Sequence, residues 1–247
     1  DMEAVKIENI KKYFKQKKKI IQAVDDVSFS IHENELFGLL GVNGAGKSTL
    51  IQLISGLIQP TSGNVICFEM DSYLKMKEVK QIINVSPQET AIAEKLSVYE
   101  NLIFMAELYG IGKEETIKKA NEMIDEFSLE DVKNQKAKTL SGGYQRRLSI
   151  AMALITSPRI LILDEPTLGL DVIARRELWD IIEKLRSKMT IILTTHYLEE
   201  AENLCDRIAI LVKGKLKALG SIEELKRLGN SNQFEDAFVH IATGKCE

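Results

Sequence analysis

The stretch that decides the fold is Gly-Val-Asn-Gly-Ala-Gly-Lys-Ser-Thr at residues 41–49. It fits the phosphate-loop pattern Gly-x-x-x-x-Gly-Lys-Ser/Thr. The apolar segment 35–40 before it predicts a short buried strand, and apolar residues behind it recur at helical spacing through Leu57. A strand, a glycine loop and a helix in this order are the context that the pattern needs. A plain glycine-rich turn would not need the Lys47-Ser48 pair, so we predict a phosphate site.

The loop offers three kinds of contact to a phosphate group. Its glycines leave room for backbone N–H groups to approach phosphate oxygens, and the helix N-terminus adds a favourable dipole. Lys47 is expected to reach the terminal phosphates and Ser48 to bind Mg²⁺. The residues predicted to hold the ligand at this loop are Gly41, Asn43, Gly44, Ala45, Gly46, Lys47, Ser48 and Thr49.

The composition excludes several classes of protein. The chain has 247 residues, of which 45% are hydrophobic and 28% charged, as is typical of a globular protein with a proper core. Its net charge of −3 argues against a broad face for nucleic acid, and we expect no nucleic-acid partner. No apolar stretch approaches the ~18 residues that span a bilayer. We therefore expect any action at a membrane to require docking onto another chain.

The N-terminal segment predicts a β-hairpin. Residues 5–10 and 23–31 alternate like strands, and the basic run Lys15-Gln16-Lys17-Lys18-Lys19 lies between them. A solvated hairpin tip is the favoured interpretation of this run, and a nucleic-acid contact is the other. Tyr13 precedes the tip. Its ring could stack on a purine base, which contributes about 1–3 kcal/mol, or could simply pack against the protein.

A predicted helical insertion follows the strand 82–88. Gln88 at the strand end could reach a metal ion or a water, or could be an ordinary surface residue. From about 89 to 157 helical patterns replace strand alternation, with one predicted helix face formed by Ile117, Ala120, Ile124 and Phe127. Tyr99, Leu102, Phe104, Met105, Leu108 and Tyr109 exceed what one helix face needs, and we favour core packing over a partner-docking groove.

A second helix start lies inside the insertion. Ser141, Gly142 and Gly143 lead directly into an apolar helix that runs through Ile155. An N-cap serine is the plain interpretation. The other is that this helix N-terminus faces an anion, which would give the chain either two anion sites or one site shared between two copies.

Two further strands end in polar groups. The apolar run 160–163 predicts a strand covered on both faces, and it ends at Asp164 and Glu165. We expect Asp164 to bind Mg²⁺ together with Ser48, and Glu165 to hold the attacking water as a general base. The buried strand 190–196 ends at His196, which is positioned to donate a hydrogen bond to a γ-phosphate.

Taken in order, these stretches resemble the nucleotide-binding subunit of ATP-binding cassette (ABC) transporters over nearly the whole chain. The resemblance implies an α/β fold, with a P-loop NTPase core built on a mixed, mainly parallel sheet, an N-terminal antiparallel β subdomain and a helical signature subdomain. Its implied extent is an ATPase domain at 2–228, with the helical subdomain inserted at about 89–157, and a C-terminal tail at 229–247.

The resemblance also implies a role for each motif. Tyr13 corresponds to the adenine-stacking aromatic, residues 41–49 to the Walker A loop, and Gln88 to the glutamine that senses the metal and couples to the membrane partner. The remaining matches are residues 140–144 to the signature motif, Asp164 and Glu165 to the Walker B aspartate and catalytic glutamate, Asp171 to the D-loop aspartate, and His196 to the switch histidine. Catalysis would then involve Lys47, Gln88, Glu165 and His196.

In that family two cassettes pair head to tail around two ATP molecules. Each ATP, with its Mg²⁺, would lie between Walker A of one copy and Ser141, Gly142 and Gly143 of the other, in a homodimer or a heterodimer. ATP hydrolysis to ADP and phosphate would energise an integral membrane permease from its cytoplasmic face. The family's usual signature ends in Gln, whereas position 144 here is Tyr. Related exporters of the ABC-2 type look similar there and in the tail 234–238.

Two other functions compete with transport. A non-transport ABC ATPase of the DNA repair, chromosome or translation type is one. Such relatives usually carry long coiled-coil insertions or two cassettes in one chain, and this sequence shows neither. An assembly scaffold that binds ATP without turnover is the other, and the intact Glu165 argues against it.

Overall fold

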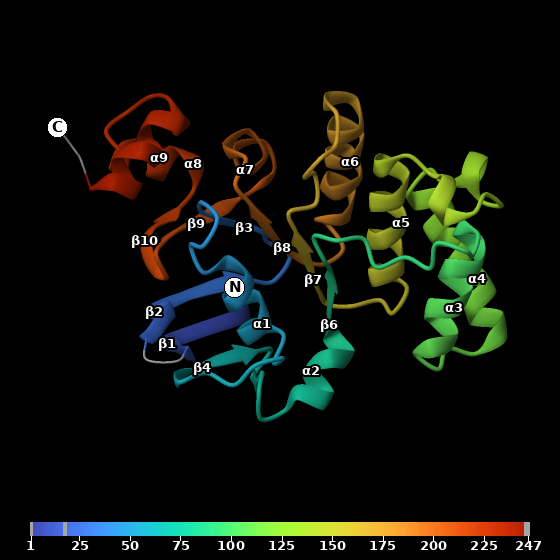
Figure 1. Cartoon of the computed structure of the whole chain (residues 1–247), viewed down its shortest axis with the longest axis horizontal. Helices are drawn as coiled ribbons and strands as arrows, with labels where there is room; N and C mark the ends of the chain where they lie inside the picture. Colours follow the sequence, from blue (N-terminus) through green and yellow to red (C-terminus); the bar gives the residue numbers. More distant parts are fainter. Residues whose placement is uncertain (1, 17–18, 245–247) are drawn as a thin grey trace.

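The computed structural model describes residues 2–16 and 19–244, whose strands form two sheets (Figure 1). The N-terminal sheet has the order β2-β1-β4-β5, with antiparallel neighbours throughout. Its strands are β1 (Glu3–Gln16), β2 (Lys19–His32), β4 (Ser62–Cys67) and β5 (Met70–Asp71). The predicted hairpin is therefore confirmed as β1 and β2, while part of its basic tip, Lys17 and Lys18, lies outside the described residues.

The second sheet is the core of the nucleotide-binding part. Its order is β10-β9-β3-β8-β7-β6, and β10 alone runs antiparallel to its neighbour in the described sheet. The strands are β3 (Leu36–Leu40), β6 (Ile83–Ser86), β7 (Ile160–Asp164), β8 (Thr190–Thr195), β9 (Arg207–Val212) and β10 (Lys215–Gly220). This mixed, mainly parallel sheet beside an antiparallel one confirms the predicted α/β fold class.

The apolar run at β7 is buried on both faces. Leu161 and Leu163 point into a core shared with the helices of the insertion. Ile160 and Ile162 point the other way, into a core shared with the N-terminal sheet. Since successive side chains of a strand alternate between faces, only a strand covered on both sides is apolar at every position. The carboxyl end of β7 thus emerges from a rigid layer.

The helices cover this sheet and form the insertion. They are α1 (Lys47–Ile54), α2 (Met76–Ile82), α3 (Val98–Leu108), α4 (Lys113–Glu126), α5 (Gly142–Leu154), α6 (Val172–Leu185), α7 (Leu198–Leu204), α8 (Ile222–Leu228) and α9 (Phe234–Thr243), with short 3₁₀ turns at Glu130–Val132 and Ala137–Thr139. In Figure 1 the green and yellow helices α3, α4 and α5 stand together, with β6 and β7 between them and the N-terminal sheet. The predicted change from strands to helices after residue 89 is confirmed, while the bounds of the helical subdomain, about 89–157, remain a prediction.

Two details of the predicted helices are wrong. The helix after the glycine loop ends at Ile54, because Gly56 adopts φ +68°, and Leu57 is therefore 55% exposed rather than buried. In α4 the buried positions are Thr116, Ala120 and Ile124, whereas Ile117 is 44% exposed. The sequence pattern therefore predicts the buried face one position too late at the start of α4. Thr116 can occupy the buried position because its hydroxyl donates to the Ile111 carbonyl.

The chain after residue 229 folds more than the sequence indicates. The segment predicted as a C-terminal tail forms α9, whose Phe234 and Ile241 are buried with residues of α7, α8, β9 and β10. Gly229 lies so close to α9 that a Cβ on it would come within 2.5 Å of Ala237 Cα. The division into a domain at 2–228 and a tail at 229–247 remains a prediction.

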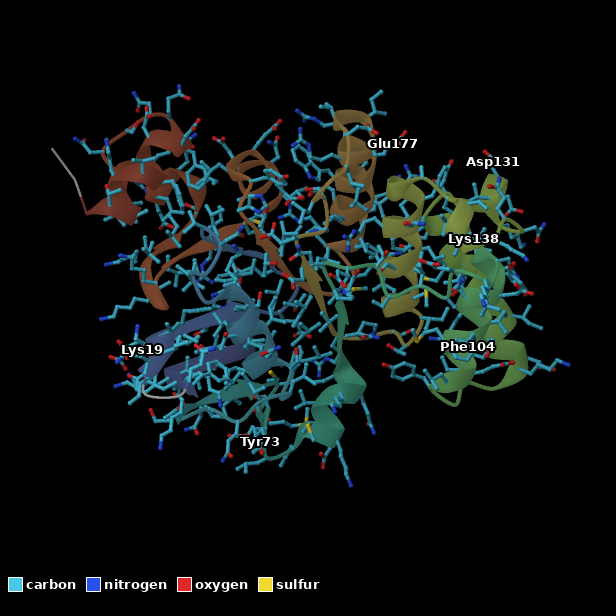
Figure 2. The ribbon with its side chains drawn as sticks, viewed as in Figure 1. Lys19, Tyr73, Phe104, Asp131, Lys138 and Glu177 are labelled. Atoms are coloured by element: carbon cyan, nitrogen blue, oxygen red, sulfur yellow. The ribbon has the colours of Figure 1, made fainter. Side chains whose placement is uncertain are left out.

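The apolar excess around α3 is only partly core. Leu102 is fully buried, but Phe104, Leu108 and Tyr109 are 50%, 66% and 52% exposed. We call these three residues the α3 patch, and Figure 2 labels Phe104 on it. The preference for core packing is therefore wrong for half of the set, because α3 buries one face against α4 and α5 and leaves the other uncovered.

The two faces of α3 predict different costs for the same substitution. Leu102→Ala is expected to lower the free energy of unfolding by about 2–5 kcal/mol, because it leaves a cavity in the core. Leu108→Ala should change it by less than about 0.5 kcal/mol, because the leucine is already in water. Urea denaturation followed by circular dichroism measures both. Equal losses for the two variants would show that Leu108 is covered.

Candidate active site

A cavity of about 430 Å³ lies against the glycine loop. It is lined by residues 42–49 of the loop, by Gln88, Asp164 and Glu165 at the carboxyl ends of the sheet strands, and by residues 21–23 and Lys213. Parallel strands place their carboxyl ends on the same edge of a sheet, where ligands bind. The fold therefore brings together, in one cavity, segments that are up to about 190 residues apart in the sequence.

Close packing around the loop explains two of its glycines. Gly46 caps α1 with φ +107°, and a Cβ on it would come within 2.6 Å of the Ala23 carbonyl oxygen. A Cβ on Gly41 would come equally close, 2.6 Å, to the Leu211 carbonyl oxygen. Side chains at these positions would push the loop away from β2 and β9. The first backbone N–H groups of α1 have no partner within the helix, so they are free to bind an anion.

Three of the predicted catalytic residues form a chain of contacts. Lys47 Nζ donates to the Gly41 carbonyl and lies 3.4 Å from Glu165 Oε1. The other carboxylate oxygen, Oε2, lies 2.9 Å from His196 Nδ1. Lys47 and Glu165 are both nearly buried, and His196 is half-buried. Because a buried charge needs a partner, each of these groups helps to hold the next.

Thr194 organises the two carboxylates, and sequence reasoning missed it. Its hydroxyl donates to Asp164 Oδ1 at 2.6 Å and accepts the backbone N–H of Glu165 at 3.0 Å. A threonine in an apolar segment indicates a strand and nothing more. Its role follows from the register of β7 and β8, which pairs Asp164 with Thr194, and a pattern within one strand does not contain that register.

Glu165 has an unusual backbone conformation for a glutamate. Its φ is +49°, in the left-handed region, which costs a residue with a Cβ about 1–2 kcal/mol. Two hydrogen bonds from its N–H to Thr194, to Oγ1 and to the carbonyl oxygen, fix this conformation. Such backbone strain is concentrated at functional sites. Here it turns the glutamate out of the strand direction and onto Lys47 and His196.

Glu200 supports the turn after Glu165 and was also missed. It is fully buried, and its Oε1 accepts hydrogen bonds from Thr167 Oγ1 at 2.8 Å and from Trp179 Nε1 at 3.1 Å. Burial raises the pKa of this carboxyl, since it disfavours the charged form. Glu200 lies on α7, directly after His196, so it joins the two segments that carry Glu165 and His196.

The predicted metal ligands fit Mg²⁺. Ser48, Gln88 and Asp164 line the same cavity, and together they offer a hydroxyl, an amide oxygen and a carboxylate. Mg²⁺ prefers such oxygen donors and usually binds through one or two carboxylates together with substrate phosphates. When bound there, the ion would neutralise negative charge on the phosphate oxygens.

Tyr13 does not line the cavity. Its hydroxyl donates to Asp25 Oδ1 at 2.5 Å, a hydrogen bond that raises the pKa of the phenol. On the sheet it pairs with Gln22 of β2, which does line the cavity. Tyr13 is therefore the strand neighbour of a cavity-lining residue, and stacking of its ring on a base stays a prediction.

The signature residues and Asp171 also lie outside the cavity. Ser141 caps α5, accepting the Tyr144 N–H at 3.4 Å, and remains exposed together with Gly142. Asp171 caps α6, accepting the N–H groups of Ile173 and Ala174 at 2.9 Å each. The plain N-cap interpretation is thus correct for Ser141. It does not exclude a ligand, because the Ser141 side chain still faces solvent.

The fold and the cavity define a class of protein, the phosphate-loop nucleoside triphosphatases. The strand, loop and helix, the lysine and serine of the loop, and the carboxylates at the end of β7 all stand where that chemistry needs them. Comparison with known proteins narrows the class. The ABC transporter family model matches residues 24–168, which is more than half of the chain. The chain belongs to the ABC transporter family.

Individual relatives agree with this assignment. The linearmycin resistance ATP-binding protein LnrL of Bacillus subtilis is 42% identical over 227 residues, covering 90% of this chain and 71% of LnrL. The human phospholipid-transporting ATPase ABCA3 is 39% identical over 223 residues, or 90% of this chain. The chain spans only 13% of the length of ABCA3.

Solved structures show the same architecture. A dimeric, post-hydrolysis state of the ATP-binding cassette MJ0796, bound to ADP and phosphate, has a TM-score of 0.79 at 29% identity, covering 88% of this chain and 98% of that one. The ATP-binding subunit of another ABC transporter has a TM-score of 0.82 at 27% identity, covering 96% and 99%. The chain is accordingly an ATPase domain that uses ATP and Mg²⁺. Within the described residues, every helix is too short or too polar to cross a bilayer.

Proposed function

We propose that the chain powers export across a membrane, through a separate integral membrane permease, by ATP-driven closure of two cassettes. One observation carries the proposal. Lys47, Ser48, Gln88, Asp164 and Glu165 line a single cavity, whereas Ser141 and Gly143 lie outside it on another part of the chain. A second copy, or a related cassette, would bring its own Ser141 and Gly143 onto the nucleotide. The dimeric state of the MJ0796 cassette supports this arrangement.

The residues of the cavity have separate tasks in this proposal. Lys47 and the loop N–H groups bind and orient the terminal phosphates. Glu165 accepts the proton of the attacking water as a general base. His196 holds the Glu165 carboxylate and can donate to the γ-phosphate. Gln88, Asp164 and Ser48 bind the Mg²⁺ ion that accompanies the nucleotide phosphates.

Two residues outside the cavity complete the proposed nucleotide site. Tyr13 would stack on the adenine, next to residues 21–23 of β2. Asp171, which caps α6 next to the carboxylate-bearing turn, would face the other cassette across the dimer. Neither lines the cavity: the role of Tyr13 depends on bound ATP, and the role of Asp171 depends on the second cassette.

The named relatives support a resistance or lipid-type exporter. LnrL confers linearmycin resistance by its name, and ABCA3 transports phospholipids by its name. The tail 234–238 and the non-glutamine residue Tyr144 also match the ABC-2 exporter group. The resemblance to that group predicts a multidrug, antibiotic or ion exporter, and of these we propose the drug or antibiotic exporter that the name of LnrL supports, with the permease determining the substrate.

The membrane partner is expected to bind this chain at the cytoplasmic face of the membrane. The α3 patch offers an uncovered apolar surface on the helical insertion, where a permease segment would gain hydrophobic contact. A non-transport ABC ATPase is the alternative function. A neighbouring gene that encodes about six apolar segments of ~20 residues would favour transport over that alternative.

Light scattering of the Glu165→Gln variant tests the shared site. We expect a monomer without nucleotide and a dimer with ATP at low salt, because blocked hydrolysis keeps the closed state populated. Adding Ser141→Arg should prevent the dimer, since a long cation would replace the serine at the second cassette's nucleotide. Ser187→Arg is the matched control, because Ser187 is exposed at the opposite edge of the sheet. A protein that stays monomeric at saturating ATP would contradict self-pairing of the isolated chain. It would leave either a heterodimer with a paralogue or a cassette that closes only when its membrane partner holds it.

A further inference from the structure

Helix α5 is bonded to β6 and to the loop after it by polar contacts at successive turns. Asn84 donates its amide to the Ala153 carbonyl at 2.9 Å, and the hydroxyls of Ser86 and Ser149 lie 3.2 Å apart. At the next turn Arg146 donates to the carbonyls of Pro87, at 2.7 Å, and Gln88. These contacts place Gln88 in a fixed relation to the helix that begins at Ser141.

The burial of Arg146 carries a free-energy cost. It is 5% exposed, and its Nε is buried without a hydrogen-bond partner among the described residues. Burial lowers the pKa of its guanidinium, while the carboxylates of Asp164 and Glu200 oppose that shift. A buried cation that binds two successive carbonyls of a loop costs more than an apolar side chain would, so a role beyond packing is needed to explain it.

The neighbouring arginine differs. Arg147 is 9% exposed, but it pairs with Glu177 of α6, which Figure 2 labels, and its guanidinium lies 5.2 Å from the centroid of the Tyr144 ring. Among the described residues, its polar partner is Glu177, and no hydrogen bond joins it to the loop at Gln88. The two arginines therefore separate two functions of one helix turn: Arg147 holds α5 to α6, and Arg146 holds the loop.

We infer that Arg146 is a positioning residue, which fixes the backbone at Gln88 and so sets where the Gln88 amide stands beside Ser48 and Asp164 in the cavity. The inference rests on the proposed role of Gln88 at the metal. A guanidinium fork binds two carbonyls in a fixed geometry, so it restrains the loop more tightly than a single donor would. Gln88 itself is exposed and follows the last residue of β6 by two positions, where the sheet no longer holds the chain.

The test measures how much Mg²⁺ improves nucleotide binding. Titration calorimetry with an imido analogue of ATP gives one dissociation constant in excess EDTA and one in excess Mg²⁺, and their ratio is the metal advantage. Arg146→Met is expected to lower this ratio about tenfold, as loss of an outer-shell partner does at other metal sites. Gln88→Ala, which removes a proposed ligand itself, is expected to lower the ratio at least as much. Arg146→Lys should give an intermediate value, since one cation cannot reproduce the fork.

Two comparisons make the result specific. Arg147→Met should keep the wild-type ratio of the two dissociation constants. This holds even if both methionine variants lose thermal stability, because both constants are measured on the same variant and a uniform loss of folded protein cancels in their ratio. The double variant Gln88→Ala with Arg146→Met should match Gln88→Ala alone, since Arg146 acts through Gln88. If Arg146→Met fails to fold, Arg146→Lys supplies the same comparison.

Three outcomes would overturn the inference, and they point to different causes. A normal ratio in Arg146→Met or Arg146→Lys, with a lowered ratio in Gln88→Ala, would show that Arg146 does not position the amide. A normal ratio in Gln88→Ala would remove the proposed metal role of Gln88, and with it the basis of the inference. A further loss in the double variant would mean that Arg146 acts by another route.

Discussion

The Glu165→Gln variant is expected to hydrolyse ATP about 10²–10⁴-fold more slowly than the wild type, which is the usual contribution of a general base. The amide keeps the shape of the side chain and its contact distance to Lys47 and His196, but it cannot accept the proton of the attacking water. ATP binding should remain, since the loop and Lys47 are unchanged. Phosphate release measures the turnover, and calorimetry with ATP measures the binding.

Glu183→Gln is the matched control for that experiment. Glu183 lies exposed on α6 and pairs with Arg186 on the surface, where an ion pair contributes little. Its hydrolysis rate should equal that of the wild type. A Glu165→Gln variant that keeps its steady-state rate would remove Glu165 as the base, whatever its position in the cavity.

Lys47→Met is expected to weaken ATP binding about tenfold to a hundredfold, in contrast to Glu165→Gln. A hydrogen bond to a charged group contributes about 1.5–3 kcal/mol, and each 1.4 kcal/mol is a factor of ten in affinity. Methionine fills a similar volume without a charge. It would also leave the Glu165 carboxylate without the cation that lies 3.4 Å away. Turnover should therefore fall as well.

Lys184→Met, on the exposed side of α6, is the control for the loss of one positive charge. Comparing Glu165→Gln and Lys47→Met, each with its own control, then separates loss of ATP binding from loss of ATP hydrolysis. Equal ATP affinity in Lys47→Met and the wild type would show that the lysine serves only the Gly41 carbonyl and Glu165. Such a result would assign phosphate binding to the backbone of the loop alone.

The sequence was sufficient where one local pattern determines the structure. The apolar runs at β7 and β8, the hairpin of β1 and β2, and the glycine loop before α1 each carry their own signal. The candidate residues of the cavity follow from the same signals, because strand ends and helix starts meet at one sheet edge. Gln88, Asp164 and Glu165 were all found in this way.

The missed features depend on contacts between distant segments. Thr194 and Arg146 matter because of what lies opposite them, across 30 and 58 residues of sequence respectively. The α3 patch is exposed because α4 and α5 pack against only one face of α3, and the patch lies on the other face. Likewise α9 gains its place from the packing of Phe234 on β9 and β10. Periodicity in one segment contains none of this information.

The backbone at Glu165 also bears on how selection acts on the chain. In the left-handed conformation at φ +49°, glycine would have less backbone strain than glutamate. Backbone strain alone would therefore favour replacing Glu165, whereas its buried contact with Lys47 favours keeping it. In a variant library, sorting for ATP hydrolysis should retain the glutamate, whereas sorting for thermal resistance alone should also admit inactive chains with glycine at this position. The conflict between the two criteria is inherent in the geometry of the turn.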